Sequence, residues 1–194
     1  MQIVPLLKYV ALRGRAWLWL VAGRQAAAIA SFDAMLSVAP HDRYALASRA
    51  HGLCQQGDRP AAITTLRQLT ASHPQLAFAW FNLGYLLEES GQLSDAGAAF
   101  ERATEVDPAL DRAWYGLALV RIRQRRLDDA VVALQKNTQL QPLSPYGWYQ
   151  LGRVHADREA LDEVGKVIRH LQGFEPRIAA QLERETGVLA AQIL

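Results

Sequence analysis

The stretch that decides the fold is residues 79–108, AWFNLGYLLEESGQLSDAGAAFERATEVDP. Gly91 separates two apolar segments of helical periodicity, and Pro108 ends the second of them. Glycine is favoured just past a helix end, and proline cannot continue a helix. Ser94 and Asp95 place oxygen acceptors and negative charge where the second helix would begin. The stretch therefore predicts a helical hairpin.

The same pattern recurs every 34 residues along the chain. Residues at this spacing are Pro40, Pro74, Pro108, Pro142 and Pro176, and also Trp80, Trp114 and Trp148. The frame gives five units without insertion, at 9–42, 43–76, 77–110, 111–144 and 145–178, with a lead-in at 1–8 and a tail at 179–194. A fixed period of this length is typical of helical repeat proteins, so we expect ten helices in an all-α chain.

Two columns of the frame contain only small or short side chains, as two closely packed helices require. They are Ala16, Ala50, Gly84, Ala118 and Gly152 on the first helices, and Ala28, Ala62, Ala96, Ala130 and Val164 on the second helices. Large apolar columns surround them: Leu12, Leu46, Trp80, Trp114 and Trp148, and Phe32, Leu66, Phe100, Leu134 and Ile168. These columns predict the core.

In these residues the chain resembles the tetratricopeptide repeat family. The third unit carries the pattern almost entire, with Trp80, Leu83, Gly84, Gly91, Ala96, Phe100, Ala103 and Pro108 in register. The resemblance covers residues 9–178 and implies a right-handed superhelix (α-solenoid) of five 34-residue helix-turn-helix repeats. It also implies a protein-binding function, with the first helix of each repeat lining a concave groove. The tail would form a capping helix, since the last repeat of such a stack needs a polar cover.

Five residues depart from the family pattern. Arg15 and Arg49 replace leucine, Arg121 and His155 replace a large apolar or aromatic residue, and Asn137 replaces alanine. These positions make the local packing uncertain but leave the expected fold unchanged.

The side chains expected in the groove are unusually aromatic. They are Trp17, Tyr44, His51, Phe78, Phe81, Asn82, Tyr85, Arg112, Tyr115, Tyr146, Tyr149 and Arg153. Aromatic residues and arginine dominate binding hot spots, so we expect the groove to hold a peptide or helix of a protein partner. Such a protein would be an adaptor or scaffold, including a chaperone or complex-assembly factor. The alternative is that these rings pack between successive repeats and stabilise the stack.

Some members of the family clamp the C-terminal carboxylate of a partner. Asn82 and Arg112 match two clamp positions, but Ala47, His51 and Gly116 replace the others. The incomplete set argues against a carboxylate clamp. Asn82 could still bond the backbone amide of a ligand.

Composition and motifs exclude several other classes of function. The chain has 194 residues, 51% of them apolar, and a net charge of +2, which is too low to indicate nucleic-acid binding. No phosphate loop, nucleophile elbow or converged set of titratable groups indicates an enzyme. His51 and the single cysteine, Cys54, lie three residues apart, but two ligands make a poor metal site. We therefore expect no catalysis, no cofactor and no metal.

The N-terminal segment leaves two further hypotheses open. Trp17, Trp19 and Leu20 belong to a first repeat without a preceding helix, so two chains could form a homodimer there. The same apolar and basic segment could instead lie on a membrane surface. Lys8, Arg13, Arg15 and Arg24 interrupt its apolar runs, which argues against a membrane span or export signal. We expect a cytoplasmic protein, with membrane association as the alternative; the Ala, Arg and Leu usage suggests a bacterial source.

Overall fold

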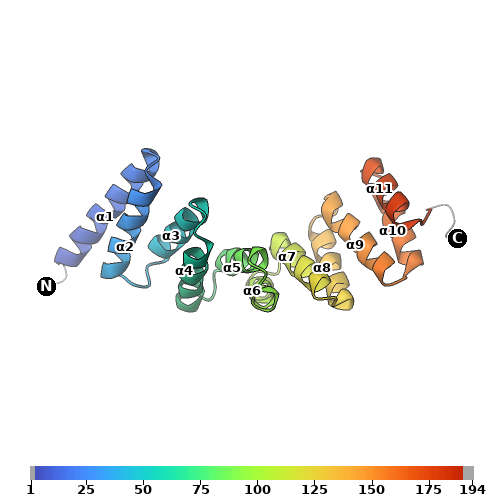
Figure 1. Ribbon diagram of the computed structural model, residues 1–194, viewed down its shortest axis with the longest axis horizontal. Coiled ribbons are helices and arrows are strands. Elements are labelled where there is room, and N and C mark those ends of the chain that lie inside the picture. The colour runs from blue at the N-terminus through green and yellow to red at the C-terminus, as the bar shows by residue number, and fades with distance from the viewer. Residues whose placement is uncertain (1–2, 190–194) are drawn as a thin grey trace. The chain divides into compact units, whose positions relative to one another are not determined.

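The computed structural model describes residues 3–189, with side chains from residue 7 onward. In this part of the chain every regular element is a helix (Figure 1). The eleven helices described are α1 (Ile3–Val21), α2 (Gln25–Val38), α3 (Arg43–Gln55), α4 (Arg59–Ser72), α5 (Ala77–Glu89), α6 (Leu93–Val106), α7 (Asp111–Arg123), α8 (Leu127–Leu140), α9 (Pro145–Asp157), α10 (Leu161–Gln172) and α11 (Pro176–Thr186). The predicted all-α fold, a helical repeat solenoid, is confirmed.

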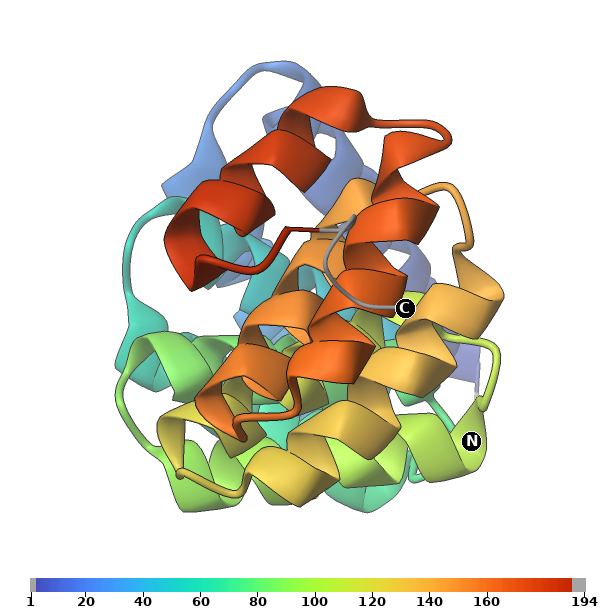
Figure 2. The same cartoon turned by 90° about the vertical axis from the view of Figure 1, so that its right-hand side faces the viewer.

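The chain divides into two compact units, residues 1–87 (unit 1) and residues 88–194 (unit 2). In unit 1, α1 packs on α2, α2 on α3, and α3 on α4. In unit 2, each helix from α6 to α10 packs on the next, and α11 packs on both α9 and α10 (Figure 2). Helices that are neighbours in sequence are thus neighbours in space within each unit.

The small-residue columns lie in the helix interfaces. Ala16 and Ala28 are at most 1% exposed and share a cluster with Leu12, Phe32 and Met35. In unit 2, a β-carbon on Gly152 would overlap Cδ2 of Leu182. Small side chains at these positions therefore let the helix backbones approach closely.

The turn inside each hairpin needs a left-handed residue, and glycine does not always supply it. Gly23, Gly57 and Gly91 have φ of 69°, 81° and 75°. Arg125 and Glu159 occupy the same place with φ of 60° and 58°. A left-handed conformation costs a non-glycine residue roughly 1–2 kcal/mol. Packing of the flanking helices therefore holds these two turns in the repeat geometry.

A hydrogen bond links the tryptophan and proline columns. The indole Nε1 of Trp80, Trp114 and Trp148 donates to the carbonyl oxygen of Pro74, Pro108 and Pro142, at 2.9, 2.9 and 2.8 Å. Each tryptophan lies six residues after its proline. The indole is only half-buried, because its N–H edge points to the loop before the helix. The bond provides a donor for a proline carbonyl oxygen that lies in the loop, outside the hydrogen-bond ladders of the helices.

Trp114→Phe is expected to lower the free energy of unfolding by about 1 kcal/mol, because it removes the bond to Pro108 and leaves the apolar packing largely in place. Urea unfolding followed by circular dichroism measures the change. Trp17→Phe is the control, since Trp17 is 60% exposed. Equal losses in the two variants would show that the loop bond contributes nothing.

Polar contacts accommodate four of the five residues that depart from the family pattern. Arg15 Nε donates to Ser31 Oγ at 3.2 Å, and Arg49 Nε pairs with Asp33 at 2.6 Å. The Arg121 guanidinium pairs with Glu101, and Asn137 Nδ2 donates to the Asp111 carbonyl at 3.0 Å. His155 differs from them and belongs to the cavity of unit 2 described below.

The C-terminal helix differs in extent from the 179–194 expected of a cap. α11 begins at Pro176, because proline is favoured in the first helical turn, and it ends before Gly187, whose φ is +70°. Residues 190–194 of the expected helix and residues 1–2 of the expected lead-in lie outside the described residues. Leu182 of α11 is fully buried, so the helix covers the end of the α9/α10 hairpin.

Candidate functional site

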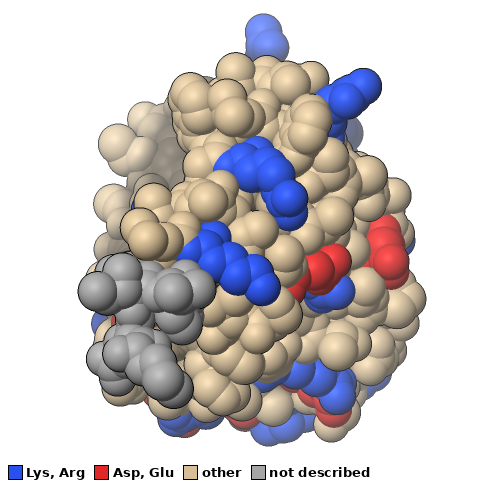
Figure 3. Space-filling model, turned by 90° about the vertical axis from the view of Figure 1, so that its left-hand side faces the viewer, with Lys and Arg blue, Asp and Glu red and all other residues tan. Residues whose placement is uncertain are grey.

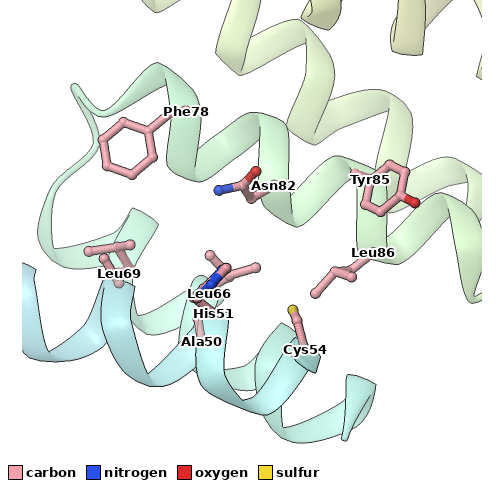
Figure 4. Close-up of a pocket in the computed structure, with 10 residues that line it drawn as sticks. Ala50, His51, Cys54, Leu66, Leu69, Phe78, Asn82, Tyr85 and Leu86 are labelled. Carbon is pink, nitrogen blue, oxygen red and sulfur yellow. The ribbon is translucent and has the colours of Figure 1, made fainter. Parts of the chain in front are cut away.

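A pocket of about 260 Å³ lies in unit 1, between α3, α4 and α5 (Figure 4). Its lining residues are Ala47, Ala50, His51, Cys54, Leu66, Leu69, Phe78, Asn82, Tyr85 and Leu86. Four of them, His51, Phe78, Asn82 and Tyr85, are among the residues that the sequence predicts for the groove. The structure brings these four together around one cavity.

The polar and aromatic side chains of the pocket come from two helices, α5 and α3, which form two facing walls. Phe78, Asn82 and Tyr85 are separated by four and three residues, so they project from one face of α5. His51 and Cys54, three residues apart, project from α3 on the opposite wall (Figure 4). The N-cap Asp42 side chain accepts from Ala45 N at 2.7 Å and fixes the start of α3.

The pocket has an apolar floor and a more polar rim. Ala50, Leu66, Leu69 and Leu86 are buried and form the floor. At the rim, Phe78 is 46% and Tyr85 is 48% exposed, and His51 and Asn82 are also exposed. An apolar cavity with a few polar groups at its mouth is the usual form of a binding site for a small ligand or side chain.

The other predicted residues of unit 1 lie outside this pocket. The Tyr44 ring packs edge-on against Phe32 with 6.0 Å between centroids, and the Arg13 guanidinium lies 4.7 Å above it. Phe81 is half-buried on α5, and Trp17 is exposed on α1. For Tyr44, the contacts fit the alternative of packing between repeats.

In unit 2, two predicted groove residues contact the C-terminal helix. The Tyr149 hydroxyl donates to Glu185 at 2.6 Å and accepts from Gln181 at 3.2 Å. Arg153 lies 5.8 Å from the Tyr149 ring centroid and 4.0 Å from the Glu185 carboxylate. The bond to Glu185 raises the pKa of Tyr149. Sequence reasoning did not include Glu185, because nothing in the tail indicated which side chain α11 would turn toward α9.

The remaining predicted residues of unit 2 are Arg112, Tyr115 and Tyr146. Arg112 is exposed on α7, and Tyr146 is 72% exposed on α9. Tyr115 is half-buried, and burial raises the pKa of its hydroxyl. None of the three lines the pocket of unit 1 or the cavity of unit 2 described below.

A second cavity, of about 490 Å³, lies in unit 2 among α8, α9 and α10. His155 lines it, is only 5% exposed, and has no hydrogen-bond partner for Nδ1 among the described residues. Burial lowers the pKa of His155, and the nearby Glu163 carboxylate opposes that effect. The sequence marked His155 as a departure from the family pattern, but not as part of a cavity.

His155→Leu is expected to raise the free energy of unfolding by about 1–2 kcal/mol, because leucine removes a buried polar atom without a partner. In the wild type, the unfolded chain binds a proton at His155 below about pH 6.5 more readily than the folded chain does. Stability should therefore fall as the pH drops through this value, and the fall should be smaller in the variant. Denaturant titrations between pH 5 and 8 measure both effects. The control is His51→Leu at an exposed position; equal pH profiles for wild type and His155→Leu would contradict the prediction.

The described residues contain no group of three or more His, Cys, Asp or Glu side chains that could hold a metal ion. His51 and Cys54 share the pocket of unit 1, but no third ligand of these types joins them there. The pocket residues suit apolar contact and hydrogen bonding.

Comparisons with known proteins agree on the fold. A family model described as tetratricopeptide repeat matches residues 48–111 and 87–137. No curated protein matches the chain. Solved structures that are similar include MamA from Desulfovibrio magneticus RS-1, with 22% identity over 92% of this chain and 96% of that one and a TM-score of 0.73.

Two further solved structures are similar over most of their length. YrrB, described as a tetratricopeptide repeat protein with an unusual peptide-binding site, is 16% identical over 87% of this chain and 88% of that one, with a TM-score of 0.76. PilF of Pseudomonas aeruginosa is 17% identical over 97% of this chain and 90% of that one, with a TM-score of 0.69. At these identities the likeness concerns the fold alone.

Proposed function

Because the chain is a tetratricopeptide repeat protein, we propose that it binds a peptide segment of a protein partner in the pocket of unit 1. Proteins of this family are in general non-catalytic interaction modules. The observation that carries the proposal is the set of aromatic and polar side chains around one apolar cavity. The chain would thus serve as an adaptor that holds a partner for assembly.

The pocket suits one apolar side chain of the peptide. Its volume of about 260 Å³ is enough for a leucine or phenylalanine side chain above Leu66, Leu69 and Leu86. Full burial of such a side chain is worth about 1.5–3 kcal/mol. Phe78 and Tyr85 stand at the mouth as large, rigid contact surfaces.

Asn82 is placed to bind the peptide backbone. It lies between Phe78 and Tyr85 on α5 and projects toward the cavity (Figure 4). A primary amide offers one acceptor and two donors, which match the N–H and C=O groups of an extended peptide. Recognition through Asn82 would not depend on the peptide sequence, whereas the apolar cavity would select one side chain.

The likeness to YrrB supports this function, because that protein is described as having a peptide-binding site on the same fold. In unit 2, Tyr149 and Arg153 already contact Glu185, whereas Arg112 and Tyr146 are exposed and lie outside the proposed site.

The test is selection of a displayed random-peptide library on the wild-type protein, followed by fluorescence anisotropy with the selected peptides. Phe78→Ala/Tyr85→Ala should weaken binding at least about tenfold, since two hot-spot rings are lost. Asn82→Ala should weaken all selected peptides to a similar extent. Tyr146→Ala is the matched control, an exposed aromatic residue of unit 2 outside the pocket.

Circular dichroism of each variant should show unchanged helicity, because Phe78 and Tyr85 are half exposed. Failure to select any peptide, or equal affinity of wild type and Phe78→Ala/Tyr85→Ala, would overturn the proposed function. Loss of binding only in Tyr146→Ala would move the site to unit 2.

A further inference from the structure

Helix α1 carries a stripe of exposed apolar residues, spaced three and four residues apart as on one face of a helix. The α1 stripe consists of Leu7, Val10, Ala11, Gly14, Trp17, Leu18 and Val21. Leu7, Val10, Trp17, Leu18 and Val21 are each between 58% and 69% exposed. The stripe is about 21 Å long, from the helical rise of 1.5 Å per residue.

The stripe is separate from the face through which α1 joins the core. Leu12 and Ala16 are 8% and 0% exposed and pack in a cluster with Ala28 and Phe32 of α2. More than half of each large side chain of the stripe is therefore left uncovered by the other described residues.

The 34-residue repeat pattern does not account for the whole stripe. The positions 34, 68, 102 and 136 residues after Val21 are Gln55, Glu89, Arg123 and Asp157. All four are polar or charged, although they occupy the place of Val21 on the first helices. An apolar residue at position 21 therefore distinguishes α1 from the other first helices.

Basic residues flank the stripe on α1, and the described part of α1 contains no acidic residue, although Asp42 at the start of α3 interacts with Tyr9 of α1. Between residues 7 and 32 the charged residues are Lys8, Arg13, Arg15 and Arg24, and the first acidic residue is Asp33. The spacing places Lys8 and Arg15 along one edge of the stripe and Arg13 along the other. Figure 3 looks onto the end of unit 1 that α1 occupies, where several Lys and Arg side chains lie among uncharged residues, with fewer Asp and Glu side chains beside them.

We propose that the α1 stripe docks on the surface of an anionic lipid bilayer. The apolar side chains, Trp17 among them, would enter the boundary between headgroups and acyl chains. The flanking Lys and Arg side chains would contact the phosphate groups of the lipids. The helix would lie in the plane of the membrane. No described helix has both the length and the apolar character needed to cross a bilayer.

Charge favours a lipid surface over a second copy of this chain. Pairing α1 with α1 of another copy would bring Lys8, Arg13 and Arg15 of both copies to the edges of one interface. The described part of α1 has no acidic residue to pair with them, and like charges in an interface are costly. Anionic headgroups supply the missing negative charge.

Vesicle flotation tests the proposal, using phosphatidylcholine vesicles with and without phosphatidylglycerol. Wild type should bind the anionic vesicles at least about tenfold more tightly, and added salt should weaken binding. Leu18→Glu/Val21→Glu should reduce that binding at least about tenfold, because it places charge in the stripe. The matched control is Leu143→Glu/Val132→Glu, which alters apolar residues of unit 2 that are 73% and 63% exposed.

Three results would overturn the proposal: wild type that does not float with anionic vesicles, equal binding to both vesicle types, or equal binding by Leu18→Glu/Val21→Glu. Light scattering of the same proteins tests whether a second copy of the chain binds the stripe instead. A dimeric wild type together with a monomeric Leu18→Glu/Val21→Glu variant would assign the stripe to a dimer interface. The stripe variant should bind the selected peptides as tightly as the wild type does. The peptide assay and the vesicle assay therefore test the pocket of unit 1 and the α1 stripe independently.

Discussion

Leu182→Ala is expected to lower the free energy of unfolding by about 2–5 kcal/mol, the range for removing a buried leucine side chain. Leu182 of α11 is fully buried, and it contacts the backbone of α9 at Gly152. Truncation would leave a cavity between α11 and the α9/α10 hairpin. Chemical denaturation gives the magnitude, and limited proteolysis near α11 shows whether the cap detaches.

A double-mutant cycle with Gly152→Ala makes this prediction specific. A β-carbon at Gly152 would overlap Cδ2 of Leu182 and lie 3.2 Å from Cγ1 of Val167, so Gly152→Ala alone should destabilise by about 1–3 kcal/mol. In the double variant the added methyl group enters the space that Leu182→Ala vacates. The double variant should therefore lose less stability than the sum of the single variants. Strict additivity would show that Gly152 and Leu182 do not share one packed interface.

Glu101→Ala is expected to cost about 2–3 kcal/mol. The Arg121 side chain is only 7% exposed and pairs with Glu101, so the substitution leaves a buried guanidinium without its carboxylate. The loss should fall below the 3–5 kcal/mol range for a fully buried pair, because the Glu101 side chain is 48% exposed and water can reach the site. Denaturant unfolding at low and high salt measures the loss.

Arg121→Met is the matched variant for this pair. Methionine fills a similar volume and removes the buried charge together with the need for a partner, so the variant should stay within about 1 kcal/mol of the wild type. If Arg121→Met is as unstable as Glu101→Ala, then the apolar contacts of Arg121, and not its charge, hold this part of unit 2 together.

Sequence reasoning predicted the helices of the repeat because their signals are local and periodic. The left-handed residue of the turn follows from Gly57 or Gly91, and the buried columns follow from small residues that recur every 34 positions. The tryptophans at this spacing were assigned to the core. Their bonds to the loop prolines were not foreseen, because a propensity for burial does not specify where a polar edge points.

The candidate site could be predicted only as a set of residues on one face of the first helices. Phe78, Tyr85 and Tyr149 are aromatic residues expected in the same groove, and the sequence does not rank one above another. Their places in the structure distinguish them, since Tyr149 lies against α11 and bonds to Glu185, whereas Phe78 and Tyr85 line the pocket of unit 1. Their role in binding remains the prediction that the peptide experiment tests.

The sequence by itself determined the all-α class, the hairpin period and the residues that allow helices to approach, because each depends on spacing along one chain. The tertiary structure alone decided which polar residues find partners. Arg121 meets Glu101 twenty residues away, whereas the similarly placed His155 keeps an unpartnered Nδ1 beside a cavity. It also decided that α1 buries one apolar face and exposes another. Such outcomes depend on distances between side chains that are remote in sequence, and these distances exist only once the helices have packed.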